Sequence, residues 1–316
     1  MSGENLSRFL MENMTTASMA KLQQWSTKLL EFAHYVSEKP CKGMALVTSG
    51  GTAVPIEVNS VRYLSNFSSG GRGAGMVEAL LQRGWACVFL YHERSSRPFR
   101  RNLDHLSTEQ LFAELAAPVR SPNIVAAMQA YERLGDRILY VPFNTVTEYL
   151  FLLQLLSEAM SHRAECLKSL PMMLIAAAAV SDYFIPLSRM STHKISGGDG
   201  LHVHFENVPK ALDFISERWH LSSATVPRYL ITFKLETEEE TLKKKALQNL
   251  FKYKCDAVVA NMLQNYRERV VLYWKREEHQ PVPLLRPEVG SFEALIVDAF
   301  LERIEKEMSK NAESIQ

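Results

Sequence analysis

The feature that most constrains the fold is a strand, loop, helix and strand in succession between residues 44 and 91. An apolar run at 44–48 has the length of a buried strand and stops at the glycine pair of residues 50 and 51. Apolar residues at helical spacing follow and end near Gly84, and a second apolar run covers 85–91. Two such strands joined by a helix form a βαβ unit, which requires parallel pairing and a right-handed crossover. The segment therefore predicts an α/β protein.

Two polar, glycine-rich loops interrupt this unit, at residues 48–52 and 66–73. Glycines let a ligand approach the backbone closely, and the second loop leads into the predicted helix. Exposed backbone N–H groups and the helix dipole favour anions at such a position. We predict that the two loops bind a phosphate-rich ligand.

The rest of the chain extends the same pattern. Four further apolar runs, at 138–143, 172–180, 229–233 and 256–260, are expected to be buried strands. Helical segments separate them, which favours a doubly wound, mostly parallel sheet with helices on both faces. We also expect a frayed segment at 1–18, a docked helix at 22–36, a loose insertion at 92–135, a strand at 201–205, an edge hairpin at 270–285 and a closing helix at 291–308.

Residues that could contact a ligand follow the ends of several predicted strands. They are the loop at 49–52, Ala178 to Asp182, the pair Phe233 and Lys234, and Asn261, with the Asn66 loop beside the first. Because parallel strands end at one edge of a sheet, these residues should converge in space. No nucleophile elbow or Ser/His/Asp order is visible, so the site is expected to work by positioning and charge stabilisation.

Composition narrows the class of protein. Of 316 residues, 36 are Lys or Arg and 35 are Asp or Glu, so no global field favours nucleic acid or an anionic membrane. The longest apolar run is about half of the roughly 20 residues that span a bilayer. Cys41, Cys87, Cys166 and Cys255 form no CxxC pair, which favours a reducing, cytoplasmic location. We predict no protein metal site.

Six motifs in order resemble phosphopantothenoylcysteine synthetase, also called phosphopantothenate–cysteine ligase, of the monofunctional eukaryotic type. They are Thr-Ser-Gly-Gly-Thr at 48–52, Val-Arg-Tyr-Leu-Ser-Asn-Phe-Ser-Ser-Gly at 61–70, Ala-Ala-Ala-Val-Ser-Asp at 177–182, His-Lys-Ile at 193–195, Phe-Lys-Leu-Glu-Thr at 233–237 and Val-Ala-Asn at 259–261.

The resemblance implies a Rossmann-like fold with a small β dimerisation element. It also implies amide formation between 4'-phosphopantothenate and L-cysteine in coenzyme A biosynthesis. ATP, or else CTP, would be the co-substrate, and its phosphates would carry Mg²⁺. The carboxylate would first displace pyrophosphate to give an acyl-nucleotidylate, which the amine of cysteine would then attack.

Site residues follow from the matching positions. The resemblance implies nucleotide contacts by Gly50, Ser68, Gly70, Gly73, Phe233 and Asn261, and contacts with the phosphopantothenoyl arm by Asn66, Ala178, Ala179 and Asp182. Asn66, Lys194 and Asp182 would be catalytic: a neutral amide suits the oxyanion of the second step, and an ammonium suits the α-phosphate. Family members are homodimers, and Arg62 would reach the neighbouring subunit's site.

Two features leave alternatives open. Bacterial relatives carry several lysines where this chain has Lys194 alone, so Lys243, Lys244, Lys245 or Lys254 could contact the triphosphate instead. Glu93 follows the second strand, where dinucleotide-binding oxidoreductases of the NAD(P)-dependent class place a ribose-binding acid, although GxGxxG is absent. A non-catalytic nucleotide-binding protein is the other alternative.

We expect a helical extension at 1–40, one ligase domain at 41–310 and a tail at 311–316.

Overall fold

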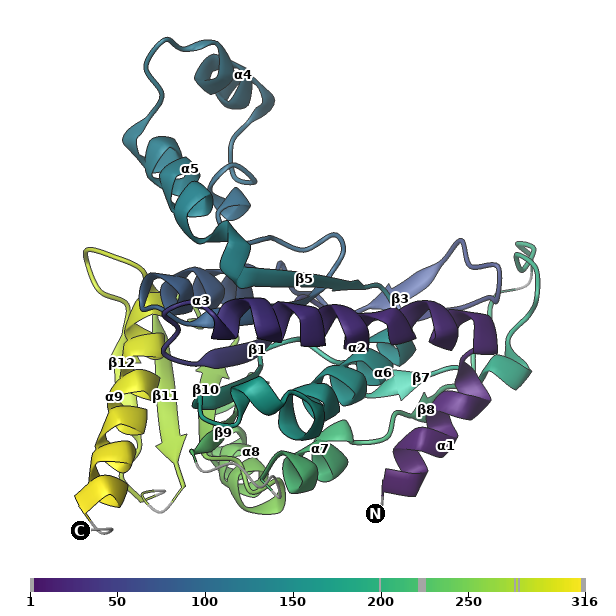
Figure 1. Ribbon diagram of the computed structural model, residues 1–316. Coiled ribbons are helices and arrows are strands. Elements are labelled where there is room, and N and C mark those ends of the chain that lie inside the picture. Colours follow the sequence, from purple (N-terminus) through teal and green to yellow (C-terminus); the bar gives the residue numbers. More distant parts are fainter. Residues whose placement is uncertain (1–2, 199, 221–225, 276, 278, 314–316) are drawn as a thin grey trace.

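An eight-stranded sheet forms the centre of the computed structural model, which describes residues 3–198, 200–220, 226–275, 277 and 279–313. The strands lie in the order β12-β11-β10-β9-β6-β1-β4-β5 (Figure 1). Their bounds are β1 Met44–Ser49, β4 Ala86–His92, β5 Ile138–Phe143, β6 Met172–Ala176, β9 Arg228–Glu236, β10 Ala257–Met262, β11 Arg269–Trp274 and β12 Val282–Leu285.

Six of these strands are parallel, and their order confirms the doubly wound fold. From β5 through β4, β1, β6 and β9 to β10, the chain-order numbers read 3-2-1-4-5-6. The order reverses between β1 and β6, which pair in parallel with Val47 opposite Ile175. Ligands of open α/β sheets bind outside the carboxyl ends of the strands at such a switch point.

Helices cover both faces of the sheet, as expected. The helices are α1 Gly3–Asn13, α2 Thr16–Ser37, α3 Gly71–Gln82, α4 Thr108–Ala116, α5 Pro122–Leu134, α6 Val146–Glu158, α7 Ala211–His220, α8 Glu239–Lys252 and α9 Phe292–Glu313. Along β1, Met44 and Leu46 face the core shared with α2 and α6, whereas Ala45 and Val47 face the core shared with α3 and α9. This period of two explains why the strand is apolar throughout.

The prediction of a frayed segment at 1–18 was wrong. Residues 3–13 form α1, and its Leu6, Phe9 and Leu10 are buried in the core. The ring of Phe9 lies edge-on to Phe184, 4.8 Å away between centroids. The Thr15 side chain accepts a hydrogen bond from the Ser18 N–H and caps α2. The polar residues between these apolar positions concealed an amphipathic helix in the sequence.

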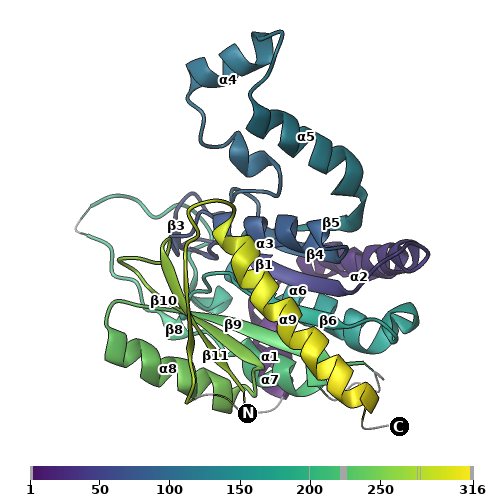
Figure 2. The same cartoon turned by 90° about the vertical axis from the view of Figure 1, so that its left-hand side faces the viewer.

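The segment predicted as a loose insertion at 92–135 contains two helices. Both α4 and α5 project from the β5 side of the sheet (Figures 1 and 2). Ser107 and Gln110 form a capping box at the start of α4, and Pro122 opens α5. These start signals were present in the sequence, but neither helix has the wide apolar face from which a helix is usually predicted.

The edge hairpin is confirmed, whereas the strand expected at 201–205 is wrong. Strands β11 and β12 pair antiparallel beyond β10. Residues 201–205 have no regular secondary structure, and pairing begins after them, where β8 (Glu206–Asn207) meets β7 (Tyr183–Phe184). A further two-stranded sheet joins β2 (Ala53–Pro55) to β3 (Tyr63–Ser65). Residues 201–205 alternate between apolar and polar, but they form no strand because no neighbouring strand in the described part of the chain pairs with them.

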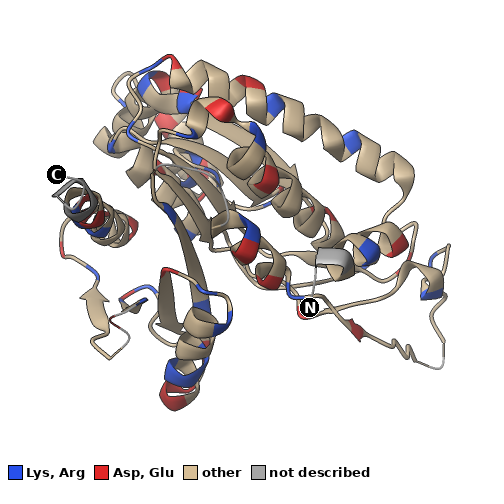
Figure 3. Ribbon diagram, turned by 60° about the horizontal axis from the view of Figure 1, so that its bottom comes forward, with Lys and Arg blue, Asp and Glu red and all other residues tan. Residues whose placement is uncertain are grey.

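The ribbon in Figure 3 shows Lys and Arg interspersed with Asp and Glu along the chain, in keeping with the balanced composition. Within the described ranges, we find no helix whose length and apolar character would let it cross a bilayer.

Candidate functional site

The loops that follow β1 and β6 are bonded to each other at the switch point. Thr52 N–H donates to the Ala179 carbonyl (3.0 Å), and Ala179 N–H donates to the Gly50 carbonyl (2.9 Å). Two buried threonine hydroxyls complete the connection: Thr48 Oγ1 accepts from Ala178 N–H (3.0 Å) and Thr52 Oγ1 from Ser181 N–H (2.9 Å). The predicted anion loop and the segment ending in Asp182 therefore form one rigid floor.

Glycines let α3 begin directly against the end of β1. Gly70 precedes the helix with φ of 75°, and Ser49 Oγ donates to its carbonyl oxygen (2.9 Å). A methyl group on Gly73 would lie 2.5 Å from Ser49 Oγ, so the helix could not approach the strand with a larger residue there. The helix N-terminus lies next to the exposed loop, which is the arrangement for which we predict an anion.

Asn66 lies between the two bonded loops. Its backbone N–H donates to the Thr52 carbonyl (3.2 Å), and its side-chain Nδ2 lies 3.4 Å from the Val180 carbonyl oxygen. The residue is exposed to solvent. Its amide thus stands at the surface beside Ala178 and Ala179, where a ligand could compete for the long hydrogen bond.

Gly51 is the residue that allows this approach. A methyl group there would lie 2.1 Å from the Asn66 carbonyl oxygen, a backbone atom that cannot rotate away. We expect Gly51→Ala to lower the free energy of unfolding by about 1–3 kcal/mol and to displace the Asn66 loop. The matched control is Gly71→Ala, whose methyl group would come no closer than 3.5 Å to Ser69 Oγ. Urea unfolding of both variants tests this, and equal stabilities would contradict it.

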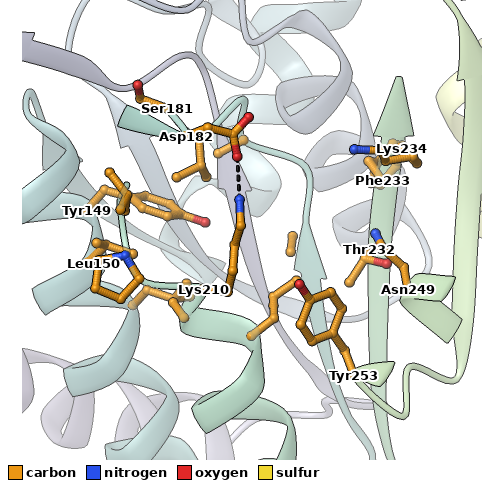
Figure 4. A pocket seen from close by; sticks show the side chains of 18 residues that line it. Tyr149, Leu150, Ser181, Asp182, Lys210, Thr232, Phe233, Lys234, Asn249 and Tyr253 are labelled. Atoms are coloured by element: carbon orange, nitrogen blue, oxygen red, sulfur yellow. Dashed lines mark hydrogen bonds and ion pairs between the residues drawn. The ribbon is translucent and has the colours of Figure 1, made fainter. Parts of the chain in front are cut away.

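A cleft of about 220 Å³ opens beside the floor, between β6, β9 and the helices α6, α7 and α8 (Figure 4). Lys210, directly before α7, extends across it to an ion pair with Asp182. Ala178, Phe233 and Lys234 also line it. The cleft therefore contains a residue predicted to contact the phosphopantothenoyl arm, Ala178, and one predicted to contact the nucleotide, Phe233. On its far wall the buried Tyr149 hydroxyl lies 3.5 Å from Thr48 Oγ1, and burial raises the pKa of Tyr149 to about 12.

Asn261 and Phe233 come from neighbouring strands, β10 and β9, as the strand-end argument predicts. Asn261 Nδ2 donates to the carbonyls of Val259 (3.3 Å) and Lys234 (3.4 Å). Its Oδ1 is buried without a hydrogen-bond partner among the described residues. An unsatisfied buried acceptor at a strand end is suited to a donor on a ligand, such as an amino group of a base.

Three charged side chains, Lys234, Glu236 and Lys245, lie near Asn261 at this end of the strands. Glu236 accepts from Lys245 Nζ (2.8 Å) and lies 3.3 Å from Lys234 Nζ. Partial burial raises the pKa of Glu236, but the hydrogen bonds from the two lysines outweigh it and leave the pKa below its ordinary value. Two ammonium groups therefore share one carboxylate, and this group of three side chains carries a net charge of one positive unit.

Arg62 is bound within its own chain. Its Nη1 donates to Glu57 Oε1 (2.8 Å) and its Nη2 to the Ile195 carbonyl (2.9 Å). Glu57 is fully buried, whereas the Arg62 side chain is 36% exposed. The pair ties the loop that carries Lys194 to the segment after β2, and Lys194 itself is exposed on that loop.

The structure thus brings together most of the predicted residues. The glycine loops, Asn66, Ala178, Ala179 and Asp182 meet at the switch point, and Phe233 and Asn261 border them from β9 and β10. Lys194 and Arg62 lie on a separate loop pair. Lys210 and Tyr149 were missed. The sequence signal for Lys210 was the proline before it, since proline favours the start of a helix. Tyr149 resembles any buried tyrosine of a helix.

Fold and site together define a doubly wound α/β protein with glycine-rich loops at the topological switch point and a cleft beside them. Within the described residues, no three His, Cys, Asp or Glu side chains are placed to hold a metal ion.

Comparison with known proteins gives the particular family. The model of the DNA/pantothenate metabolism flavoprotein C-terminal domain matches residues 42–131 and 154–289. Phosphopantothenate–cysteine ligase 2 of Oryza sativa is 39% identical over 73% of this chain and 71% of the relative, and the Homo sapiens phosphopantothenate–cysteine ligase is 32% identical over 81% and 83%. The chain belongs to the phosphopantothenate–cysteine ligase family.

A solved structure agrees with this assignment. A Cab2 mutant in complex with phosphopantothenate-cysteine superposes with a TM-score of 0.79 at 28% identity, covering 96% of this chain and 99% of the other. The phosphopantothenate–cysteine ligase CAB2 of Saccharomyces cerevisiae is itself 31% identical over 83% of this chain.

Proposed function

We propose that this protein joins 4'-phosphopantothenate to L-cysteine in coenzyme A biosynthesis, with a nucleoside triphosphate as co-substrate. The observation that carries the proposal is the cleft at the switch point. Asp182 lines this cleft, and the neighbouring loop of residues 50–52 is hydrogen-bonded to Ala179, while Asn66 Nδ2 lies 3.4 Å from the Val180 carbonyl oxygen. The chain is also similar to a Cab2 mutant solved with phosphopantothenate-cysteine, which supports the proposal. ATP is the preferred co-substrate in this proposal, CTP the alternative, and Mg²⁺ arrives with the nucleotide phosphates.

In the first step the carboxylate of 4'-phosphopantothenate attacks the α-phosphate, and pyrophosphate leaves. Backbone N–H groups near Gly50, Gly70 and Gly73, with Ser68, hold the triphosphate at the N-terminus of α3. Phe233 stacks near the nucleotide base. The unsatisfied Oδ1 of Asn261 accepts a hydrogen bond from an amino group of that base. Lys194 neutralises the α-phosphate, a role for which its loop must fold toward the switch point.

In the second step the amine of cysteine attacks the acyl carbon, and the nucleoside monophosphate leaves. Asn66 Nδ2 exchanges its long bond to Val180 for the developing oxyanion. Ala178 and Ala179 hold the acyl end of the arm, and Asp182 lies beside that end. The glycine loops therefore serve activation, and the Asn66 amide serves transfer.

The protein acts as a homodimer in this proposal. Arg62 has five N–H donors, and its contacts with Glu57 and Ile195 use two of its nitrogens. The exposed part of the guanidinium remains available to a neighbouring subunit's substrate, while buried Glu57 fixes its direction.

The test is cysteine-dependent release of pyrophosphate from ATP or CTP in the presence of 4'-phosphopantothenate. Release that requires all three substrates is expected. Tight binding of NADH without nucleotide turnover would favour the oxidoreductase alternative instead. Against that alternative, Glu93 Oε2 is already bound by Asn144 Nδ2 (3.0 Å). Nucleotide binding without any turnover would favour the non-catalytic protein.

A further inference from the structure

The ion pair between Lys210 and Asp182 spans the cleft without stabilising the fold. Their side chains are 53% and 66% exposed, and exposed ion pairs contribute roughly 0–1 kcal/mol. A cation directly before a helix is also poorly placed, because the helix N-terminus carries positive partial charge. Such a pair can open at little cost when a ligand offers both charges.

The backbone nevertheless holds the two residues in register. Val208 N–H donates to the Asp182 carbonyl (2.9 Å), and the ladder of β7 and β8 pairs Tyr183 with Asn207. The carboxylate and the ammonium are thus fixed on two facing segments at the mouth of the cleft (Figure 4). Neither segment has to move for a small ligand to enter between them.

The cleft has the size and lining for an amino acid. Its volume of about 220 Å³ lies below the roughly 300–1,000 Å³ of sites that take larger organic ligands. Ala176, Ala178 and Leu150 give it an apolar wall, which suits a thiol side chain because cysteine behaves as a small hydrophobe. Lys234, the other ammonium in the lining, is already paired with Glu236.

We infer that Lys210 and Asp182 form the subsite for L-cysteine: Lys210 binds its α-carboxylate and Asp182 its α-ammonium. This assignment rests on the proposed ligase function and names which part of the cleft takes the second substrate. The zwitterion replaces the ion pair of the free protein charge for charge. Asp182 comes two residues after Val180, whose carbonyl oxygen lies 3.4 Å from Asn66 Nδ2, so the subsite and the proposed oxyanion site share one loop.

The transfer step then balances as follows. The ammonium gives one proton to an Asp182 carboxylate oxygen, and the freed lone pair forms the C–N bond with the acyl carbon. The bond from that carbon to the nucleotide's phosphate oxygen breaks, and its electron pair leaves with the nucleoside monophosphate. The second proton lost from nitrogen passes to the departing phosphate.

Lys210→Met, assayed in the full chain with L-cysteine and with cysteamine, tests the subsite. Cysteamine has the same amine and thiol but no carboxylate. We expect kcat/KM for L-cysteine to fall about 10- to 100-fold, as for loss of one charge-assisted hydrogen bond. The values for cysteamine and the KM for 4'-phosphopantothenate should stay within about two-fold. Lys210→Arg should recover part of the preference for L-cysteine.

The matched control is Lys168→Met, which removes another exposed lysine of an ion pair, with Glu165 (2.6 Å), before β6. It should change none of these constants. Equal losses with both amines, an unchanged KM for L-cysteine, or a raised KM for 4'-phosphopantothenate alone would overturn the subsite. A wild-type chain without cysteine-dependent pyrophosphate release would instead overturn the proposed function. Thermal melting of each variant separates these results from misfolding.

Discussion

Replacing Asn66 by alanine is expected to slow amide formation about 100- to 1,000-fold while pyrophosphate release continues, so that the acyl-nucleotidylate accumulates. The reason is the division of contacts around this residue. Its backbone, which alanine retains, holds the loop to Thr52, whereas its side chain makes one long bond to Val180. Activation needs phosphates in position, but transfer needs a donor for the developing oxyanion. Rapid quench with separation of the nucleotide products measures both steps.

Two further variants sharpen this result. Asn66→Asp keeps the shape but cannot donate when ionised, so it should fail at the same step. Asn123→Ala removes an exposed asparagine in the first turn of α5, which projects from the β5 side of the sheet, and should leave both steps unchanged. All three should unfold within about 0.5 kcal/mol of wild type, as expected of exposed positions. An Asn66→Ala enzyme that stops before pyrophosphate release would show that the side chain serves activation instead.

Removing Arg62 is expected to destabilise the fold by about 3 kcal/mol, at the low end of the range for a broken buried ion pair because the arginine is partly exposed. Arg62→Ala leaves the fully buried Glu57 carboxylate without its cation. The Lys194 loop also loses its tether at Ile195, so pyrophosphate release should slow. Urea unfolding combined with the pyrophosphate assay measures both effects.

The double variant Glu57→Gln with Arg62→Ala is the control for stability. It removes the buried charge as well, so it should be more stable than Arg62→Ala alone. The difference in unfolding free energy between the two variants gives the cost of leaving Glu57 charged without its cation. If Arg62→Ala unfolds like wild type, the pair contributes nothing to the fold.

Mixing subunits tests the proposed role of Arg62 in the neighbouring site. A dimer of one Arg62→Ala subunit and one Asn66→Ala subunit retains a single site with both residues only if the arginine comes from the partner. Activity restored on mixing is therefore expected. Mixtures no more active than the separate variants would place Arg62 in its own site.

The sequence predicted the sheet well because each parallel strand is buried on both faces. Continuous apolar runs such as those of β1 and β6 leave little choice of structure, and the chain order of strands and helices then determines which ends meet. The crossover helices also begin with ordinary start signals: Thr145 caps α6, and its side chain accepts a hydrogen bond from the Glu148 N–H. Most of the candidate site followed from the same argument about strand ends.

What the sequence did not predict depends on contacts across the fold. The helix α1 is polar along most of its length and is held by packing on α6 and on Phe184. Glu57 gave no signal as a buried acid, since its partner Arg62 and the Ile195 loop reach it through tertiary structure. Lys210 became significant only when the structure placed it opposite Asp182.

The central claim, that the carboxylate of 4'-phosphopantothenate is activated as an acyl-nucleotidylate and then passed to cysteine, has a direct isotopic test. Substrate labelled with ¹⁸O in that carboxylate is turned over with ATP, or with CTP, and L-cysteine, and the products are analysed by ³¹P NMR. We predict that the label appears in the nucleoside monophosphate and that pyrophosphate is unlabelled. Label in inorganic phosphate, or nucleotide that is not consumed when cysteine is present, would contradict the account.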